Sequence, residues 1–227
     1  MKKKTTTFTT LAFIVLAFGN HVRAQTAAAE HQHMVSQTCS ELPAGQKRPE
    51  FGCFIVASSK GVQLSRSETY WHLQKFPNRA NAEAAKSANG IILEDQGQFW
   101  LSEFGPDDIA PRGGDPAVII GPLELPYAKS YDAQIAYAVL RPGDRSRVHT
   151  HPGPEAWYML AGDQCLETPN GTKKAKAGET MSVEAGVPME LSITGSTVRR
   201  SFTLVIHDST KGWGENSDWK PTGACGK

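Results

Sequence analysis

The sequence predicts a mainly β protein, in which an antiparallel β-barrel or jelly roll follows a smaller N-terminal α+β module. Three observations support this fold class. Short strand-like runs separated by turns recur from about residue 117 to 208. An Ala-rich segment, 78–88, starts at a candidate Asn cap and predicts a helix in the module. Two histidines and a glutamate within the strand-rich part have a spacing that suits a metal site.

The chain begins with features typical of a secretory signal. Lys2, Lys3 and Lys4 precede an apolar run at 11–18, and Ala24 closes a small-residue cleavage pattern. That run is too short to span a bilayer. We therefore expect a periplasmic or secreted protein, with no membrane contact after cleavage. The expected segments are a signal peptide at 1–24, a flexible tail at 25–48, the α+β module at 49–125, the barrel at 126–208 and a C-terminal tail at 209–227.

The module should contain four strands around the helix. Apolar or alternating runs predict these strands at 52–57, 69–76, 91–94 and 98–104. Residues 106–116 are rich in Pro, Gly and Asp, which predicts a loop.

Charge and cysteine content narrow the classes of partner. Loss of residues 1–24 would move the formal charge of the 227-residue chain from +1 to −3, which argues against nucleic acid as a partner. All four cysteines lie after the signal, and an even number in an exported chain permits two disulfides. Three pairings are possible, of which chain order favours Cys39 with Cys53 and Cys165 with Cys225.

The most informative segment is the run from Gly143 to Gly162. His149 and His151 are separated by one residue, so they point the same way on a strand. A Pro-Gly-Pro turn follows, and Glu155 can start the next strand beside them. Two imidazoles and one carboxylate would then converge on one point, as a divalent metal requires.

This run, written G-x5-H-x-H-x3-E-x6-G, resembles the first signature motif of the cupin superfamily. The resemblance covers roughly residues 131–208 and implies a cupin-type barrel that holds one divalent metal ion: iron, manganese, zinc or copper. Cupins often dimerise by strand exchange, so a homodimer is one option.

The second cupin motif is only partly matched. Gly178 and Gly186 fall in register, but Glu184 and Ile193 stand where the family usually has Pro and Asn. Met189 stands where the family usually supplies a third His ligand. Three alternatives remain open: Met189 lines the cavity, it is a soft ligand that favours copper, or the site has lost its metal.

Other residues are candidates for the cavity. Strand alternation places Trp157 and Met159 on the same face as Glu155, where they would form an apolar wall, although such stripes are more often plain core. His207 could supply a further imidazole, although a single His at a strand end more often faces solvent. The direction of its side chain cannot be read, because the residues before it do not alternate cleanly.

Two functions fit these features. Two histidines and a carboxylate with open positions resemble the facial triad of non-haem iron oxygenases, so we expect a dioxygenase-like oxidoreductase or an isomerase that acts on a small organic molecule. No second carboxylate or histidine is placed to act as a base, so the catalytic residues are unassigned. The alternative is a non-catalytic cupin that binds or senses a small ligand, with a structural or absent metal.

Overall fold

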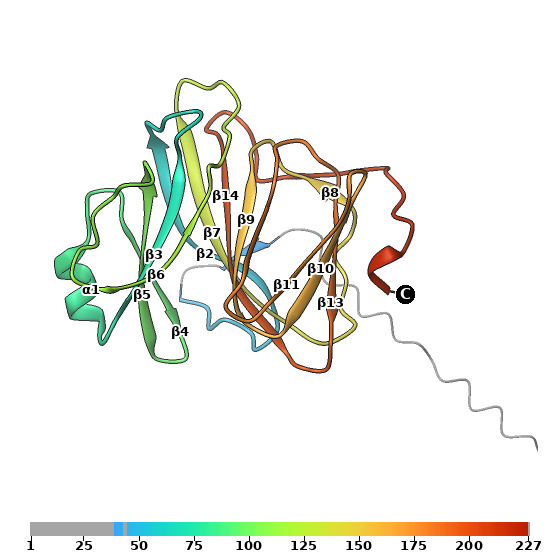
Figure 1. Ribbon diagram of the computed structural model, residues 1–227, viewed down its shortest axis with the longest axis horizontal. Coiled ribbons are helices and arrows are strands. Elements are labelled where there is room, and N and C mark those ends of the chain that lie inside the picture. Colours follow the sequence, from blue (N-terminus) through green and yellow to red (C-terminus); the bar gives the residue numbers. More distant parts are fainter. Residues whose placement is uncertain (1–38, 43–44, 227) are drawn as a thin grey trace, which may run out of the picture. The chain divides into compact units, whose positions relative to one another are not determined.

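Strands dominate the computed structural model, which describes residues 39–42 and 45–226 (Figure 1). The predicted signal peptide, 1–24, and most of the predicted tail, 25–48, lie outside these residues and stay predictions. In the part of the chain that is described, no helix is both long and apolar enough to cross a membrane.

A six-stranded sheet forms the centre of the fold. Its neighbouring strands are antiparallel except for the parallel pair β1 and β2. The strand order is β1 (Ser40–Glu41), β2 (Gly52–Val62), β7 (Tyr131–Leu140), β14 (Arg199–Asp208), β9 (Glu155–Ala161) and β12 (Thr180–Val183). The strand predicted at 52–57 therefore pairs with β7 in this sheet, where the sequence had placed it in the N-terminal module. Since the two strands are far apart in sequence, no local pattern could reveal their pairing.

Shorter sheets lie opposite one face of the central sheet. They comprise β11 (Gly171–Lys176), β10 (Asp163–Thr168) and β13 (Glu190–Thr194), and a pair made by β15 (Glu215–Asn216) and β8 (His149–Thr150). An apolar cluster with Leu140, Met159, Leu166 and Ile193 draws on both layers. The arrangement is a jelly roll. The described strands do not form the expected closed barrel. In the segment that runs from β7 to β8, only isolated bridges, such as that of Arg145 with Ser192 on β13, connect one layer to the other.

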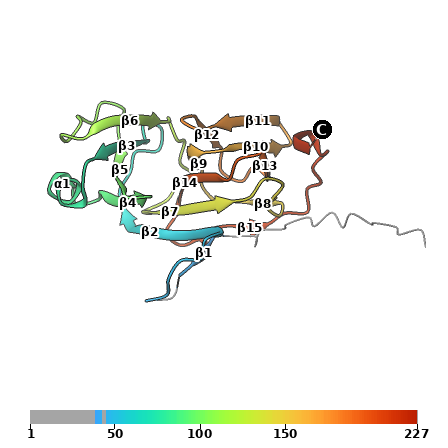
Figure 2. The same ribbon diagram turned by 90° about the horizontal axis from the view of Figure 1, so that it is seen from below.

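A four-stranded sheet covers the other face of the central sheet (Figures 1 and 2). Its strand order is β4 (Ile91–Asp95), β5 (Gln98–Gly105), β3 (Tyr70–Phe76) and β6 (Asp115–Ile120), and α1 (Arg79–Ala85) packs against it. Asn78 caps this helix as predicted, since its side chain accepts a hydrogen bond from the Asn81 N–H at 2.9 Å. The fourth strand is β6, which begins at the end of the segment predicted as a loop.

Strand β14 is buried on both sides, which explains why polar and apolar residues do not alternate along it. Phe202, Leu204 and Ile206 join the core shared with the four-stranded sheet. Thr203 lies on the opposite face, where it lines a pocket between the sheets. A strand covered on both faces lacks the alternation of a half-exposed strand.

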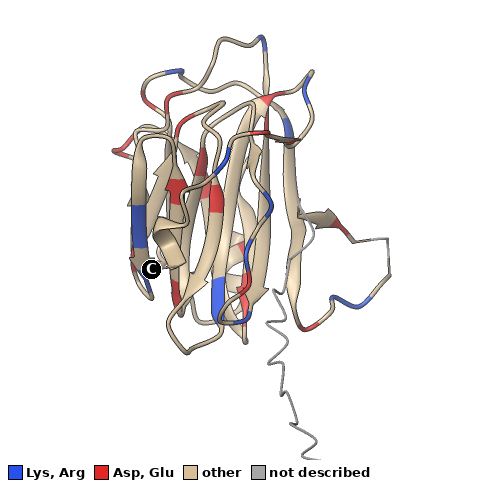
Figure 3. Cartoon of the chain, turned by 90° about the vertical axis from the view of Figure 1, so that its right-hand side faces the viewer, with Lys and Arg blue, Asp and Glu red and all other residues tan. Residues whose placement is uncertain are grey.

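Two disulfides join the chain as its order suggested. Cys39 pairs with Cys53, and Cys165 on β10 pairs with Cys225 in the short 3-10 helix η1 (Ala224–Gly226). The second bond fixes the end of the C-terminal tail on the three-stranded sheet. Two disulfides are compatible with an extracellular protein. Basic and acidic side chains are interspersed over the strands and loops seen in Figure 3.

Candidate metal centre

Backbone pairing from two directions holds the histidine pair. His149 and Met189 exchange backbone hydrogen bonds, with N···O distances of 3.1 and 2.9 Å. On the other side β15, from the C-terminal tail, pairs with β8 and places Asn216 opposite His149. His151 directly follows β8, and its carbonyl accepts a hydrogen bond from the Gly186 N–H at 2.8 Å. These hydrogen bonds fix the backbone positions from which the two imidazoles project.

The predicted Pro-Gly-Pro turn delivers Glu155 to the same place. Gly153 packs against the backbone of Ile206 so closely that no Cβ would fit there. The Ile206 N–H donates to the Pro154 carbonyl, and Glu155 then opens β9 opposite Val205. The turn therefore needs Gly at its centre, and the carboxylate reaches the histidines because of it.

The structure brings the three predicted ligands together. One ligand atom each from His149, His151 and Glu155 lies within 4.8 Å of the others. The side chains are buried, with residue exposures of 8%, 2% and 4%. The two imidazole rings are almost perpendicular, with their centroids 5.0 Å apart. Such spacing leaves room for one ion between them.

One ring nitrogen of each imidazole forms a hydrogen bond with a backbone carbonyl, which identifies the nitrogen that carries the proton in the neutral ring. Nδ1 of His149 lies 2.8 Å from the Arg147 carbonyl, and Nδ1 of His151 lies 2.6 Å from the Trp213 carbonyl. A carbonyl only accepts, so each Nδ1 carries the proton that it donates. In the neutral ring, Nε2 then offers a lone pair, as in metal sites whose ligands are oriented by backbone carbonyls.

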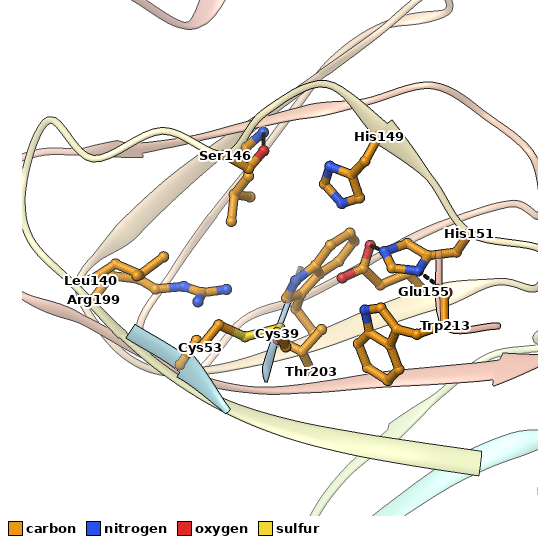
Figure 4. A pocket seen from close by; sticks show the side chains of 13 residues that line it. Cys39, Cys53, Leu140, Ser146, His149, His151, Glu155, Arg199, Thr203 and Trp213 are labelled. Carbon is orange, nitrogen blue, oxygen red and sulfur yellow. Dashed lines mark hydrogen bonds and ion pairs between the residues drawn. A yellow bond between two sulfur atoms is a disulfide. The ribbon is translucent and has the colours of Figure 1, made fainter. Parts of the chain in front are cut away.

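The centre therefore holds acceptors that face one another. Nε2 of His151 lies 3.1 Å from Oε2 of Glu155, the contact marked by a dashed line in Figure 4. This oxygen is buried and has no hydrogen-bond partner when His151 is neutral. Lone pairs opposed in this way need a cation between them. These residues fit a divalent metal ion, which would also compensate the buried charge of Glu155.

The pKa values of the two histidines respond to the same surroundings. Burial lowers the pKa of His149, against the attraction of the charged Glu155. Burial also acts to lower the pKa of His151, but the charge and contact of Glu155 and the Trp213 carbonyl raise it overall. In the absence of a metal, His151 is therefore the more basic of the two imidazoles.

A small pocket opens onto the three ligands (Figure 4). Its volume of about 60 Å³ is enough for several water molecules or one small ligand. Trp157 lines it, as the alternation along β9 predicted. The remaining lining residues are Cys39, Cys53, Ala138, Leu140, Ser146, Leu191, Arg199, Thr203 and Trp213.

The side chains of three further candidates do not line the pocket. Met159 and Met189 are buried in the apolar cluster between the sheets and are not among the residues that line the pocket. His207 is buried as well, not solvent-facing: its Nδ1 lies 2.9 Å from the Asp208 carbonyl and its Nε2 lies 2.9 Å from Oε1 of Gln134. With both ring nitrogens engaged on β7 and β14, His207 does not approach the centre.

The sequence did not identify two residues of the site. Trp213 supplies the carbonyl that orients His151, and its ring packs edge-on against that imidazole at 5.4 Å. Arg199 lines the same pocket from the start of β14. Both come from segments distant in sequence, and the residues of β14 do not alternate cleanly, so the sequence could not place Arg199 on the inner face.

Comparison with known proteins gives similarity of fold alone. No family model matches the chain, and no curated protein matches it. A cupin-like protein from Thermotoga maritima is 18% identical, with 40% of this chain and 67% of that chain covered at a TM-score of 0.34. A double-stranded β-helix protein from Klebsiella pneumoniae is 18% identical, with 38% and 76% covered at a TM-score of 0.34.

A third solved structure is a variant of salicylate 1,2-dioxygenase from Pseudoaminobacter salicylatoxidans in complex with gentisate. It is 19% identical, with 32% of this chain and 20% of that chain covered at a TM-score of 0.30.

Proposed function

We propose that this chain is an exported protein that binds one divalent metal ion through His149, His151 and Glu155. On this proposal it acts on a small organic molecule as a dioxygenase-like oxidoreductase. The observation that carries the proposal is the buried cluster of two imidazoles, each with Nδ1 directed at a backbone carbonyl, and a carboxylate oxygen without a hydrogen-bond partner. Only a cation makes this arrangement favourable.

The ligand set favours chemistry over a purely structural metal. Three protein ligands leave open positions, whereas structural zinc sites are usually closed by four. When bound, a divalent ion would polarise a substrate oxygen, and a redox-active ion would also supply reaction with O2. The chain would contribute orientation, since the Arg147 and Trp213 carbonyls hold the imidazoles in place.

The pocket walls suit a small substrate. Trp157, Leu191 and Trp213 present apolar surface around the ligands. Such walls exclude water and strengthen electrostatic interactions at the centre. The small volume of the pocket, about 60 Å³, favours a small substrate.

A second candidate function is ligand binding without catalysis. One observation favours it: among the described residues that line the pocket, no carboxylate or imidazole remains beside the three proposed ligands. A reaction that needs a separate general base would have none. An O2-dependent reaction of a bound acid or phenol does not need that base from the protein, so we place this candidate second.

Metal loading followed by O2 uptake tests the proposal. The mature chain, 25–227, is reconstituted with Fe(II), Mn(II), Cu(II) or Zn(II), and O2 consumption is followed with a panel of small carboxylic acids and phenols. Glu155→Gln should lose the metal and the O2 uptake, while Glu184→Gln, which removes an exposed carboxylate, should keep both. Metal bound without O2 uptake would favour the binding protein, and no metal with any ion would contradict the proposed function and leave a metal-free binding protein.

A further inference from the structure

Arg199 is a charged side chain enclosed in the pocket. It is the first residue of β14, and only 1% of its surface is exposed. Its partner across the sheet is Leu140, which also lines the pocket. Figure 4 shows the guanidinium group extended into the space on whose far side Glu155 and the histidines lie.

The guanidinium group is only partly satisfied. Its Nε donates to Oε1 of Gln164 at 2.8 Å, while Nη2 is buried without a hydrogen-bond partner. Arg199 forms no ion pair with any residue that the structure describes. A guanidinium carries five N–H donors and almost always finds acceptors when buried. Acceptors for its free end are therefore expected from outside the chain.

The charge of Arg199 adds to that of the proposed metal. Burial lowers the pKa of Arg199 to about 9, against the attraction of Glu155, so the group is still positive at neutral pH. Glu155 is the one carboxylate that lines the described pocket. A divalent ion together with Arg199 would exceed its single negative charge, and a buried pocket with excess positive charge favours an anionic occupant.

We propose that Arg199 binds the carboxylate of a small organic acid, which is the substrate or ligand of this pocket. The free edge of a guanidinium presents parallel N–H groups that match the two oxygens of a carboxylate. Arg199 thereby selects an anion and sets its orientation toward the metal ligands. This inference rests on the proposed function for the identity of the pocket, but the unpartnered Nη2 is present with or without a metal.

A pair of probes that differ in charge tests the inference on the wild-type protein. Binding of acetate and of its neutral analogue acetamide is measured by calorimetry, with metal-loaded and with chelator-treated mature chain. Acetate should bind at least about tenfold more tightly than acetamide in both preparations, because the guanidinium supplies charge-assisted hydrogen bonds. Equal affinities, or no acetate binding up to high millimolar concentration, would overturn the inference.

Substitutions in β14 test whether Arg199 causes the preference for acetate over acetamide. Arg199→Gln should lose the preference for acetate. Arg199→Lys should retain part of it, because lysine keeps the positive charge but lacks the paired N–H groups of the guanidinium. The matched control is Arg200→Gln, because the neighbouring Arg200 pairs with Asp95 on the opposite side of the sheet. A preference that survives Arg199→Gln, in a variant with unchanged circular dichroism, would contradict the inference.

Metal content separates this inference from the proposed function. Arg199→Gln should bind metal at the wild-type stoichiometry, because Arg199 is not among the proposed ligands. If wild type binds acetate selectively but takes up no metal, the proposed function fails and the anion site stands. If it takes up metal but does not prefer acetate, the anion site fails and the metal site stands.

Discussion

The two faces of strand β14 have the same backbone but opposite chemistry. Phe202, Leu204 and Ile206 are fully buried in a core shared with the four-stranded sheet. The other face carries Arg199 and, in the adjacent strand, Glu155, each with a buried polar atom that has no partner. One face of the sheet serves stability, whereas the other keeps polar groups available for a ligand.

The two faces also differ in whether their buried charges form ion pairs. On the side of the four-stranded sheet, Arg200 pairs with Asp95 at 3.1 Å, and Tyr137 donates a hydrogen bond to the same carboxylate. In the pocket, Arg199 and Glu155 form no ion pair with each other although both are buried. Charges that neutralise one another would not bind a ligand, so on our proposal the separation of Arg199 from Glu155 leaves each free to contact one.

The largest effect is expected from the stabilising face. Phe202→Ala removes a ring with no exposed surface and should lower the free energy of unfolding by about 3–5 kcal/mol. Thr203→Ala, the next residue on the pocket face, should cost about 1 kcal/mol. Urea unfolding of both variants measures the difference. Similar losses for the two would show that the faces are not distinct in their contribution to stability.

The next largest loss of stability is expected from breaking the disulfide that anchors the C-terminal tail. Replacement of Cys165 and Cys225 by Ser should lower the free energy of unfolding by about 2–4 kcal/mol, because the bond closes a loop of 60 residues. The Cys39–Cys53 pair spans 14 residues and should matter less. Only the first replacement should also weaken metal binding, since it releases the tail that holds Trp213. Equal effects on metal affinity would contradict this role of the tail.

A smaller, local change should affect the metal alone. A Cβ at Gly214 would lie 2.9 Å from Nδ1 of His151 and 2.8 Å from the Thr150 carbonyl, so Gly214→Ala must displace the imidazole or the tail. We expect metal affinity to fall about 10–100-fold, as when an orienting partner of a ligand is lost. Gly212→Ala is the control, because its Cβ would meet nothing within 4 Å. Competition with a metal indicator measures both, and unchanged affinity in Gly214→Ala would contradict the proposed role of His151.

The smallest effect is a pH dependence of tail docking. Burial acts to raise the pKa of Glu167, but hydrogen bonds from Thr222, Ala224 and Cys225 lower it overall from its usual 4.5. A lowered pKa in the folded state gives stability that is present above pH 4.5 and is lost as the pH falls through the folded value. The protection of tail amides, which is the intrinsic exchange rate divided by the observed rate, should therefore fall on acidification in metal-free protein. Glu167→Gln should remove that dependence, and an unchanged pH profile in this variant would refute the assignment.

The convergence of His149, His151 and Glu155 could be predicted from the sequence because the three residues are local. His149, His151 and Glu155 lie within seven residues, so strand alternation and one Pro-Gly-Pro turn fix their relative positions. The same holds for the helix after Asn78, whose cap is adjacent. Where one short segment contains all the determinants, the sequence is sufficient.

The remaining features depend on contacts between distant segments. β2 pairs with β7, and Trp213 reaches His151 through the pairing of β15 with β8. Arg199 directly precedes another arginine at the start of a strand, where charged residues are usually exposed. Its burial follows from the sheet opposite, which the local pattern does not encode.

The stoichiometry of bound metal tests the central claim most directly. Elemental analysis is made of the mature chain, 25–227, beside the double variant His149→Ala, His151→Ala, with circular dichroism to establish that both are folded. The account predicts about one equivalent of a divalent metal in the wild type and none in the folded variant. A wild-type protein without metal after reconstitution with each ion, or a variant that retains the metal, would contradict it.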